Sequence, residues 1–124
     1  MEVRLYRCKH CGNIAIKVID SGVPLVCCGE KMEELIPSST DAAVEKHVPV
    51  VSRAGDTVTV DIGSVAHPMT EEHLINLVIL DTTAGIQIAE LHAGDKPQAV
   101  FTVLSGAEVK KVYAYCNLHG LWSN

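Results

Sequence analysis

The sequence has few aromatic residues, with one Phe, one Trp and three Tyr among 124 residues. It has no apolar run long enough for a transmembrane helix, and Met1–Leu5 lacks the apolar segment of an export signal. Lys and Arg together number 10 against 15 Asp and Glu, which gives a formal net charge of −5, and there is no basic run. We therefore expect a cytoplasmic protein with neither nucleic acid nor a membrane as a partner.

The length of the chain predicts one domain, or one domain with a small appendage. Hydrophobic residues make up 48% of the sequence, which is enough for a packed core. Residues 1–36 contain only short apolar runs, and a segment of that length usually needs a metal or a disulfide to fold. We expect residues 37–46 to form a linker with a short helical turn, and residues 47–124 to form the main domain.

Four of the five cysteines lie within the first 28 residues. An odd number of cysteines without an export signal favours metal binding over disulfides, and the adjacent Cys27 and Cys28 could bridge each other only with strain. Together with Cys8-x2-Cys11 they would supply four sulfurs, a set that suits Zn²⁺ or a single iron ion. Zinc sites generally separate the second pair of cysteines, so the adjacent pair favours iron. We expect His10 to face solvent.

The rest of the chain has the pattern of short β-strands separated by turns. The expected strands are Thr57–Ile62, His73–Leu80, Gly85–Glu90, Ala99–Leu104 and Val109–Tyr115. Two of them alternate polar and apolar residues, as half-buried strands do, and His73–Leu80 is apolar on both faces. Strands at this spacing predict an all-β fold, a β-sandwich or barrel that follows the small metal-stapled module.

A second group of metal-ligand candidates consists of His47, His67, His73, Cys116 and His119. His67 and His73 flank a proline-containing turn, so both could face one point. Two residues separate Cys116 from His119, a spacing at which a tight turn presents both side chains to one ion. Four imidazoles and one thiolate would complete the protein ligands of a redox iron and leave one position open on a six-coordinate ion. His92 has no such setting and is expected to be a loop residue.

These motifs occur together and in one order along nearly the whole chain. They are Cys8-x2-Cys11, Cys27-Cys28, Glu45-Lys46-His47-Val48-Pro49, Ser64-Val65-Ala66-His67-Pro68-Met69 and Cys116-Asn117-Leu118-His119-Gly120. The set resembles desulfoferrodoxin, the family of two-iron superoxide reductases. The resemblance implies a desulforedoxin-like module with an Fe(Cys)₄ centre, followed by an immunoglobulin-like β-sandwich or barrel. It also implies a second iron with four equatorial imidazoles, the thiolate of Cys116 as the axial ligand, and therefore two irons per chain.

The activity that the resemblance implies is the one-electron reduction of superoxide, O₂⁻ + e⁻ + 2H⁺ giving H₂O₂, without release of oxygen. Such an enzyme protects the cell against oxidative stress. Glu45 and Lys46 would be a solvated pair on spacing alone, but the resemblance assigns them to catalysis. Lys46 would attract the anion and orient a water for proton delivery. Glu45 would occupy the sixth position of the ferric ion and help to displace peroxide.

The family also implies a rubredoxin-like or other reductase as the electron donor, and a homodimer as the assembly. Three other functions fit parts of the sequence. The chain could be an electron-transfer protein that uses the four-cysteine site, with a structural metal in the second site. It could be a zinc-stapled β-sandwich that acts only as a binding module. A superoxide dismutase is the third, and release of oxygen from superoxide would reveal it.

Overall fold

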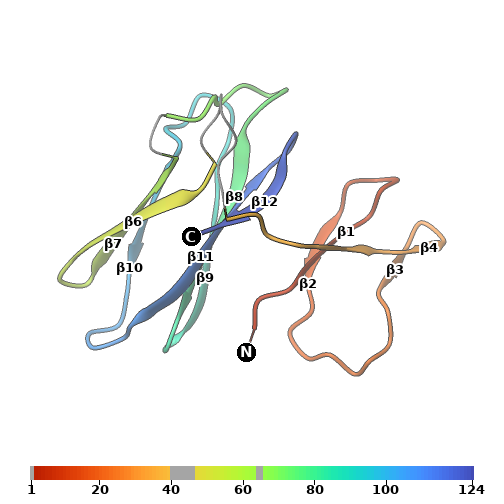
Figure 1. The fold of residues 1–124 in the computed structure, drawn as a ribbon, viewed down its shortest axis with the longest axis horizontal. Helices are drawn as coiled ribbons and strands as arrows, with labels where there is room; N and C mark the ends of the chain where they lie inside the picture. Colours follow the sequence, from red (N-terminus) through yellow and green to blue (C-terminus); the bar gives the residue numbers. More distant parts are fainter. Residues whose placement is uncertain (1, 40–46, 64–65) are drawn as a thin grey trace. The chain divides into compact units, whose positions relative to one another are not determined.

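The computed structural model describes residues 2–39, 47–63 and 66–124. The described residues form twelve β-strands and no helix, which confirms the all-β prediction. None of them belongs to a helix that could cross a membrane. The chain divides into two compact units, Met1–Ile36 and Pro37–Asn124, which Figure 1 shows as two groups of strands. The helical turn expected within residues 37–46 falls on positions 41–44 and lies outside the described residues.

The first unit is a small antiparallel structure with little core of its own. Its strands are β1 (Leu5–Arg7), β2 (Ile14–Ile16), β3 (Val26–Cys27), β4 (Glu30–Lys31) and β5 (Glu33–Leu35). They form a three-stranded sheet in the order β2-β1-β5 and a separate hairpin of β3 and β4. Among its described residues only Val3, Leu5 and Cys8 are buried. So few buried residues leave the unit dependent on another source of stability.

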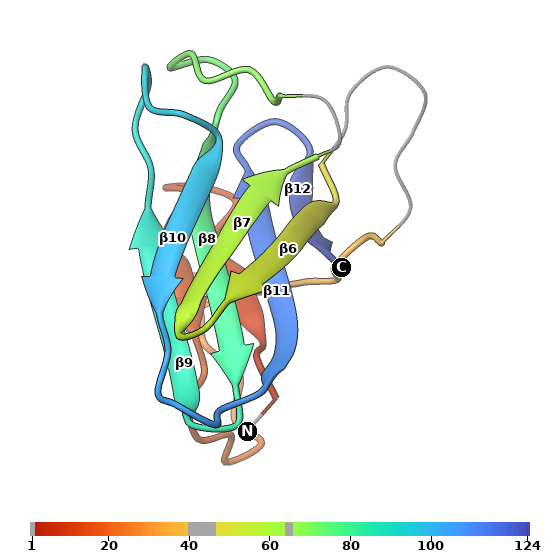
Figure 2. The same cartoon turned by 90° about the vertical axis from the view of Figure 1, so that its left-hand side faces the viewer.

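The second unit is a sandwich of two antiparallel sheets, which Figure 2 shows stacked face to face. One sheet has the order β10-β7-β6 and the other has the order β12-β11-β8-β9. The strands are β6 (Pro49–Ala54), β7 (Thr57–Ile62), β8 (Ile75–Thr82), β9 (Gly85–Glu90), β10 (Gln98–Thr102), β11 (Val109–Cys116) and β12 (Gly120–Ser123). Both sheets contribute apolar side chains to a single core.

The core follows from alternation along the strands, since every second side chain of a strand points to the same face. On β7 the buried residues are Val58, Val60 and Ile62. On β11 the same alternation begins at Val112 and ends at Cys116, which is fully buried. The pattern that builds the core therefore also brings the Cys116 thiol to the end of a core-facing row.

One expected strand begins later than the apolar pattern predicted. The expected range was His73–Leu80, whereas β8 spans Ile75–Thr82. The reason is a tight turn just before the strand, in which Thr70 and His73 exchange two backbone hydrogen bonds of 3.0 and 3.1 Å. A residue whose N–H and C=O close a turn is not available to the ladder of a sheet. His73 is therefore held in a loop.

Candidate metal centres

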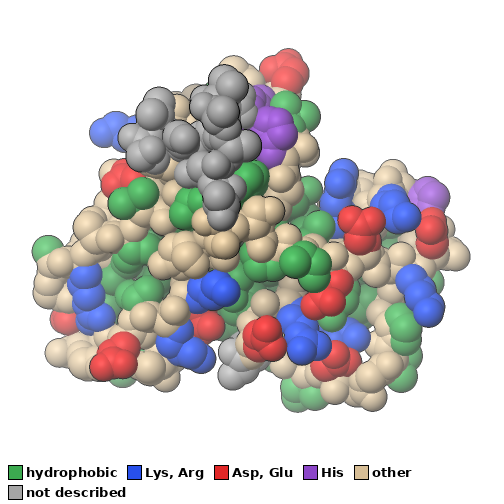
Figure 3. Space-filling view, in the orientation of Figure 1, with side chains coloured by type: hydrophobic (Ala, Val, Ile, Leu, Met, Phe, Trp, Pro, Cys, Tyr) green, Lys and Arg blue, Asp and Glu red, His purple; other side chains and the backbone are tan. Residues whose placement is uncertain are grey.

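The histidines and the cysteine of the second group meet at one end of the sandwich. His47 precedes β6, and His67 and His73 lie on the connection between β7 and β8. Cys116 is the last residue of β11, and His119 lies in the turn between β11 and β12. Figure 3 shows histidine side chains, drawn in purple, at the surface of this end of the unit. Loops from both sheets thus converge on one point.

The distances between the donor atoms are short. One donor atom from each of His47, His67, His73 and Cys116 lies within 4.8 Å of all the others. His119 Nδ1 lies 3.1 Å from Nε2 of His47 and 3.8 Å from Sγ of Cys116. The structure therefore brings all five predicted ligands of the second group together.

This arrangement fits a transition-metal ion. Bonds of about 2.1 Å from a metal to two nitrogens at a right angle place the nitrogens about 3.0 Å apart, and opposite nitrogens about 4.2 Å apart. The 3.1 Å separation of the His47 and His119 nitrogens matches the right-angle value. Imidazole suits iron, copper, zinc or nickel, and a thiolate adds a soft ligand. Iron is compatible with this donor set.

A backbone contact sets the orientation of the His67 ring. Its Nδ1 lies 2.7 Å from the carbonyl oxygen of Pro68. A carbonyl oxygen can only accept, so Nδ1 carries the proton and Nε2 carries the lone pair that a metal requires. The residue His67 is 4% exposed, as is His47, whereas His119 is an exposed residue. The group therefore lies at the boundary between the core and the solvent.

Two contacts at this site were not anticipated from the motifs. The indole of Trp122 stacks on the imidazole of His47, and the side chain of Asn117 bonds to the loop that carries His73. Asn117 has one signal in the sequence, its place directly after Cys116. Trp122 is buried, and none of the motifs marks it as a neighbour of the metal-ligand candidates.

The four cysteines of the first unit form the second candidate centre. Their sulfurs all lie within 4.8 Å of one another. The Sγ atoms of Cys11 and Cys27 are 3.6 Å apart, and those of Cys27 and Cys28 are 4.0 Å apart. Four metal–sulfur bonds of about 2.3 Å in a tetrahedron separate the sulfurs by about 3.8 Å. The group is therefore compatible with a tetrahedral ion held by four thiolates.

Two left-handed backbone positions shape this group. Gly12 has a φ of 81°, and its N–H donates to the carbonyl of Cys8 at 2.9 Å, which closes the knuckle. Cys28 has a φ of 53°, which is uncommon for a residue with a side chain. This conformation turns the side chain of Cys28 toward the same point as that of its neighbour Cys27. Adjacent cysteines can thus belong to one group because one of them adopts a strained conformation.

The pKa values of two thiols in this group are shifted in opposite directions. The backbone N–H of Cys11 lowers the pKa of the Cys8 thiol to about 6, since a hydrogen bond to the thiolate favours the charged form. The nearby sulfurs of Cys11 and Cys8 raise the pKa of the Cys28 thiol to about 12. Four thiolates this close therefore need a cation to offset their mutual repulsion. A metal ion provides that positive charge.

The remaining predicted site residues are Glu45 and Lys46, and the remaining histidines are His10 and His92. Glu45 and Lys46 fall within residues 40–46, outside the described residues. His10 is exposed, as expected, with Nε2 2.5 Å from Oε2 of Glu30. His92 is exposed in the loop between β9 and β10, also as expected. Neither of these two histidines belongs to a metal-ligand group formed by the described residues.

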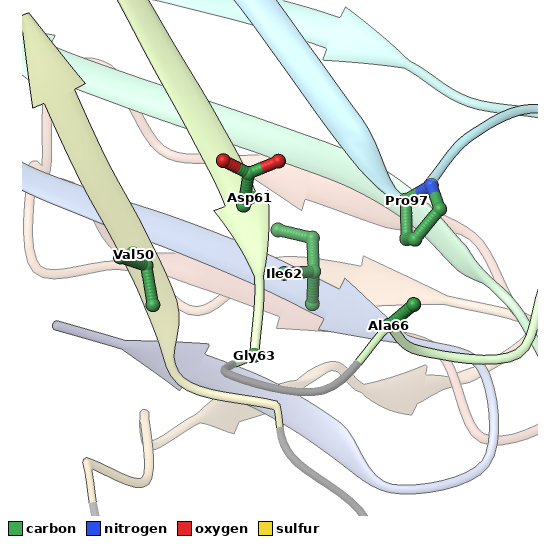
Figure 4. Close-up of a pocket in the computed structure, with 6 residues that line it drawn as sticks. All are labelled: Val50, Asp61, Ile62, Gly63, Ala66 and Pro97. Atoms are coloured by element: carbon green, nitrogen blue, oxygen red, sulfur yellow. The ribbon is translucent and has the colours of Figure 1, made fainter.

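A hollow of about 410 Å³ on the second unit is a further possible site. Figure 4 shows its lining, which consists of Val50, Asp61, Ile62, Gly63, Ala66 and Pro97. Asp61 is the one titratable residue of this lining, and its Oδ1 accepts a 2.7 Å hydrogen bond from Nε2 of Gln98. The described lining thus offers no set of metal ligands, and the candidate reaction site remains the histidine–cysteine group.

Comparisons with known proteins cover both units. The desulfoferrodoxin family model matches residues 39–124, and the model of the desulfoferrodoxin N-terminal domain matches residues 1–35. The desulfoferrodoxin of Syntrophotalea carbinolica is 45% identical, with 99% of this chain and 96% of that protein covered. The superoxide reductase of Thermococcus kodakarensis is 35% identical, with 69% of this chain and 90% of that protein covered.

A solved structure agrees with the sequence comparisons. The crystal structure of the superoxide reductase from Treponema pallidum superimposes with a TM-score of 0.88 at 35% identity. The match covers 99% of this chain and 98% of that chain, so it includes both units. Matches of this extent and identity establish the relationship, and the chain belongs to the desulfoferrodoxin family.

Proposed function

We propose that this protein is a superoxide reductase that converts superoxide to hydrogen peroxide in defence against oxidative stress. The reaction consumes one electron and two protons per superoxide and releases no oxygen. The observation that supports it is the convergence of four imidazoles and one thiol at the end of the sandwich, in a chain of the desulfoferrodoxin family. The superoxide reductases among its relatives and structural neighbours support the same activity.

The residues that would hold the catalytic iron are His47, His67, His73, Cys116 and His119. When bound there, iron supplies the electron for superoxide, and a thiolate ligand donates electron density to the metal. Cys116 has no exposed surface, since it ends a core-facing row of β11. Burial of this kind protects a thiolate from oxidation by solvent species. The core thus protects the Cys116 thiol from oxidation, whereas His119 lies at the surface.

The substrate is an anion and the chain carries a formal net charge of −5, so long-range attraction is unfavourable. A local positive charge must therefore bring superoxide to the site. We assign this role to Lys46, the residue before His47, together with the orientation of a proton-donating water. We assign a different role to Glu45, in the same segment. Its carboxylate would compete with peroxide for the sixth position of the iron and so help the product to leave.

The four cysteines of the first unit, Cys8, Cys11, Cys27 and Cys28, would hold the second iron. Their geometry supports a tetrahedral tetrathiolate centre, which can accept or donate one electron. The external electron donor would be a rubredoxin-like protein or another reductase. An electron carrier with only a structural second metal is the alternative function.

The homodimer and the cytoplasmic location are also proposals. Five large apolar side chains of the first unit are at least 65% exposed, namely Val18, Ile19, Val23, Val26 and Ile36. Exposed apolar surface at this density on a small unit favours association with a second copy. None of the five cysteines forms a disulfide, which favours the reducing cytoplasm over an oxidising compartment.

The experiment compares the iron-loaded chain with the same chain loaded with Zn²⁺, which has no redox chemistry. Superoxide is mixed with each form under anaerobic conditions, and its absorbance is followed by stopped flow with a chemical reductant present. The iron form should remove superoxide far faster than buffer does, whereas the zinc form should not. Equal rates for the iron form and for buffer would refute the proposed function.

A further inference from the structure

Asn117 connects the loop that carries His73 to the end of β11, which carries Cys116. It follows Cys116 directly, and its main contact, Leu74, follows His73 directly. The backbone N–H of Leu74 donates to Oδ1 of Asn117 at 2.9 Å. The Nδ2 group of Asn117 donates to the carbonyl of Glu71 at 3.2 Å. One amide side chain therefore bonds to both the tip and the end of the turn that presents His73.

The turn itself is closed by short-range bonds. Besides the two backbone hydrogen bonds between Thr70 and His73, the Thr70 hydroxyl lies 3.2 Å from the His73 N–H and 3.3 Å from its carbonyl oxygen. These bonds fix the shape of the turn but do not fix its place relative to Cys116. That placement depends on contacts between the turn and the end of β11.

The backbone and the side chain of Asn117 contribute separately to that placement. The backbone N–H of Asn117 donates to the carbonyl of Leu74 at 3.1 Å, and this bond would survive any substitution of the side chain. The side chain adds the two bonds to the N–H of Leu74 and the carbonyl of Glu71. A substitution therefore removes the added restraint and leaves the basic pairing of the two segments.

We propose that Asn117 is a positioning residue, whose side chain sets the separation between the His73 imidazole and the Cys116 thiolate. This inference rests on the metal site of the proposed function, in which both groups bind one ion. The relevant donor atoms already lie within 4.8 Å of each other, so a small shift of the turn would lengthen a metal–ligand bond. Residues that only orient metal ligands typically change metal affinity by about 10- to 100-fold when they are replaced.

The test measures metal binding rather than turnover. The full chain is freed of metal and then given one equivalent of Zn²⁺, which fills the four-cysteine group first because thiolates favour zinc. Co²⁺ alone is then titrated into the remaining site, and its visible spectrum reports ligand geometry. The variants are Asn117→Ala, which loses both side-chain bonds, and Asn117→Asp, which keeps the acceptor for Leu74 but loses the donor to Glu71. Gln87→Ala is the matched control.

Gln87 is a suitable control because its amide also bonds to a backbone carbonyl, that of Thr102 at 2.9 Å. The two residues lie on β9 and β10, which hold none of the metal-ligand candidates.

We expect Asn117→Ala to weaken Co²⁺ binding by about 10- to 100-fold and to alter the cobalt spectrum. Asn117→Asp should weaken it less, and Gln87→Ala should leave both unchanged. The inference would be overturned if Asn117→Ala kept the wild-type Co²⁺ affinity and cobalt spectrum. If the Ala variant does not fold, the same result for Asn117→Asp would overturn it. Failure of the wild-type chain to bind Co²⁺ would instead refute the metal site itself.

Discussion

The indole of Trp122 lies stacked on the imidazole of His47, with ring centroids 4.6 Å apart and an angle of 13° between the planes. The same indole donates its Nε1–H to the carbonyl oxygen of His119 at 3.2 Å. One buried side chain of β12 thus touches two of the five candidate ligands. It fixes the plane of the first ring and the backbone that carries the second.

Trp122→Ala should destabilise the second unit far more than Trp122→Phe does. A phenyl ring can still stack on His47, so its main loss is the hydrogen bond to His119, about 1 kcal/mol. Alanine removes the stacked ring as well and should lower the free energy of unfolding by about 3–5 kcal/mol. Denaturant unfolding of the zinc-loaded chain measures both values. Equal losses for the two variants would show that the stacking contributes nothing.

Cys116→Ser should abolish superoxide removal while the first unit remains intact. Serine supplies no soft thiolate, so the variant should lose the thiolate-to-iron absorption of the second site and at least about 100-fold in the rate of superoxide consumption. The matched control is Cys28→Ser, which removes a sulfur from the other group. With an artificial reductant, Cys28→Ser should keep the activity and lose the absorption of the four-cysteine centre. The opposite pattern would place the reaction in the first unit.

Removal of metal should unfold the first unit and leave the sandwich folded. Among its described residues only Val3, Leu5 and Cys8 are buried, which is too little apolar surface to offset the conformational entropy of the unit. A structural zinc site in a small module contributes about 10–16 kcal/mol. Hydrogen exchange of the metal-free chain should therefore show loss of protection in β1, β2 and β5. Full protection of these strands without metal would contradict the account.

Leu80→Ala and Leu104→Ala provide a paired test of the core of the second unit. Leu80 has no exposed surface, whereas Leu104 is 72% exposed. We expect the first substitution to lower the free energy of unfolding by about 2–5 kcal/mol and the second to change it by less than about 0.5 kcal/mol. Denaturant titration of the zinc-loaded chain gives both values. A similar loss for both variants would mean that the two sheets do not share this core.

Strands with clear alternation could be predicted closely from the sequence. The expected ranges Thr57–Ile62 and Gly85–Glu90 coincide with β7 and β9. The strand β6 was missed because it begins at a proline and has no clean alternation, and β12 was missed because it has only four residues. Strands without a clear pattern of their own are specified by the strands with which they pair.

The candidate site was predictable to the level of its metal-binding groups. The motifs predicted two groups of metal ligands, and the structure brings the residues of each group together. The contacts of Asn117 and Trp122 were not predictable, because they join segments more than 40 residues apart or depend on ring orientation. Such relations appear only when the sheets pack. The roles of Glu45 and Lys46 remain predictions.

The most direct test of the central claim is the yield of products from a known amount of superoxide. The iron-loaded, fully reduced chain is mixed anaerobically with superoxide, and hydrogen peroxide and oxygen are measured on the same sample. A superoxide reductase gives one hydrogen peroxide for each superoxide consumed and no oxygen, which is the result that we predict. One oxygen and one peroxide for every two superoxides would identify a dismutase and contradict the proposed function.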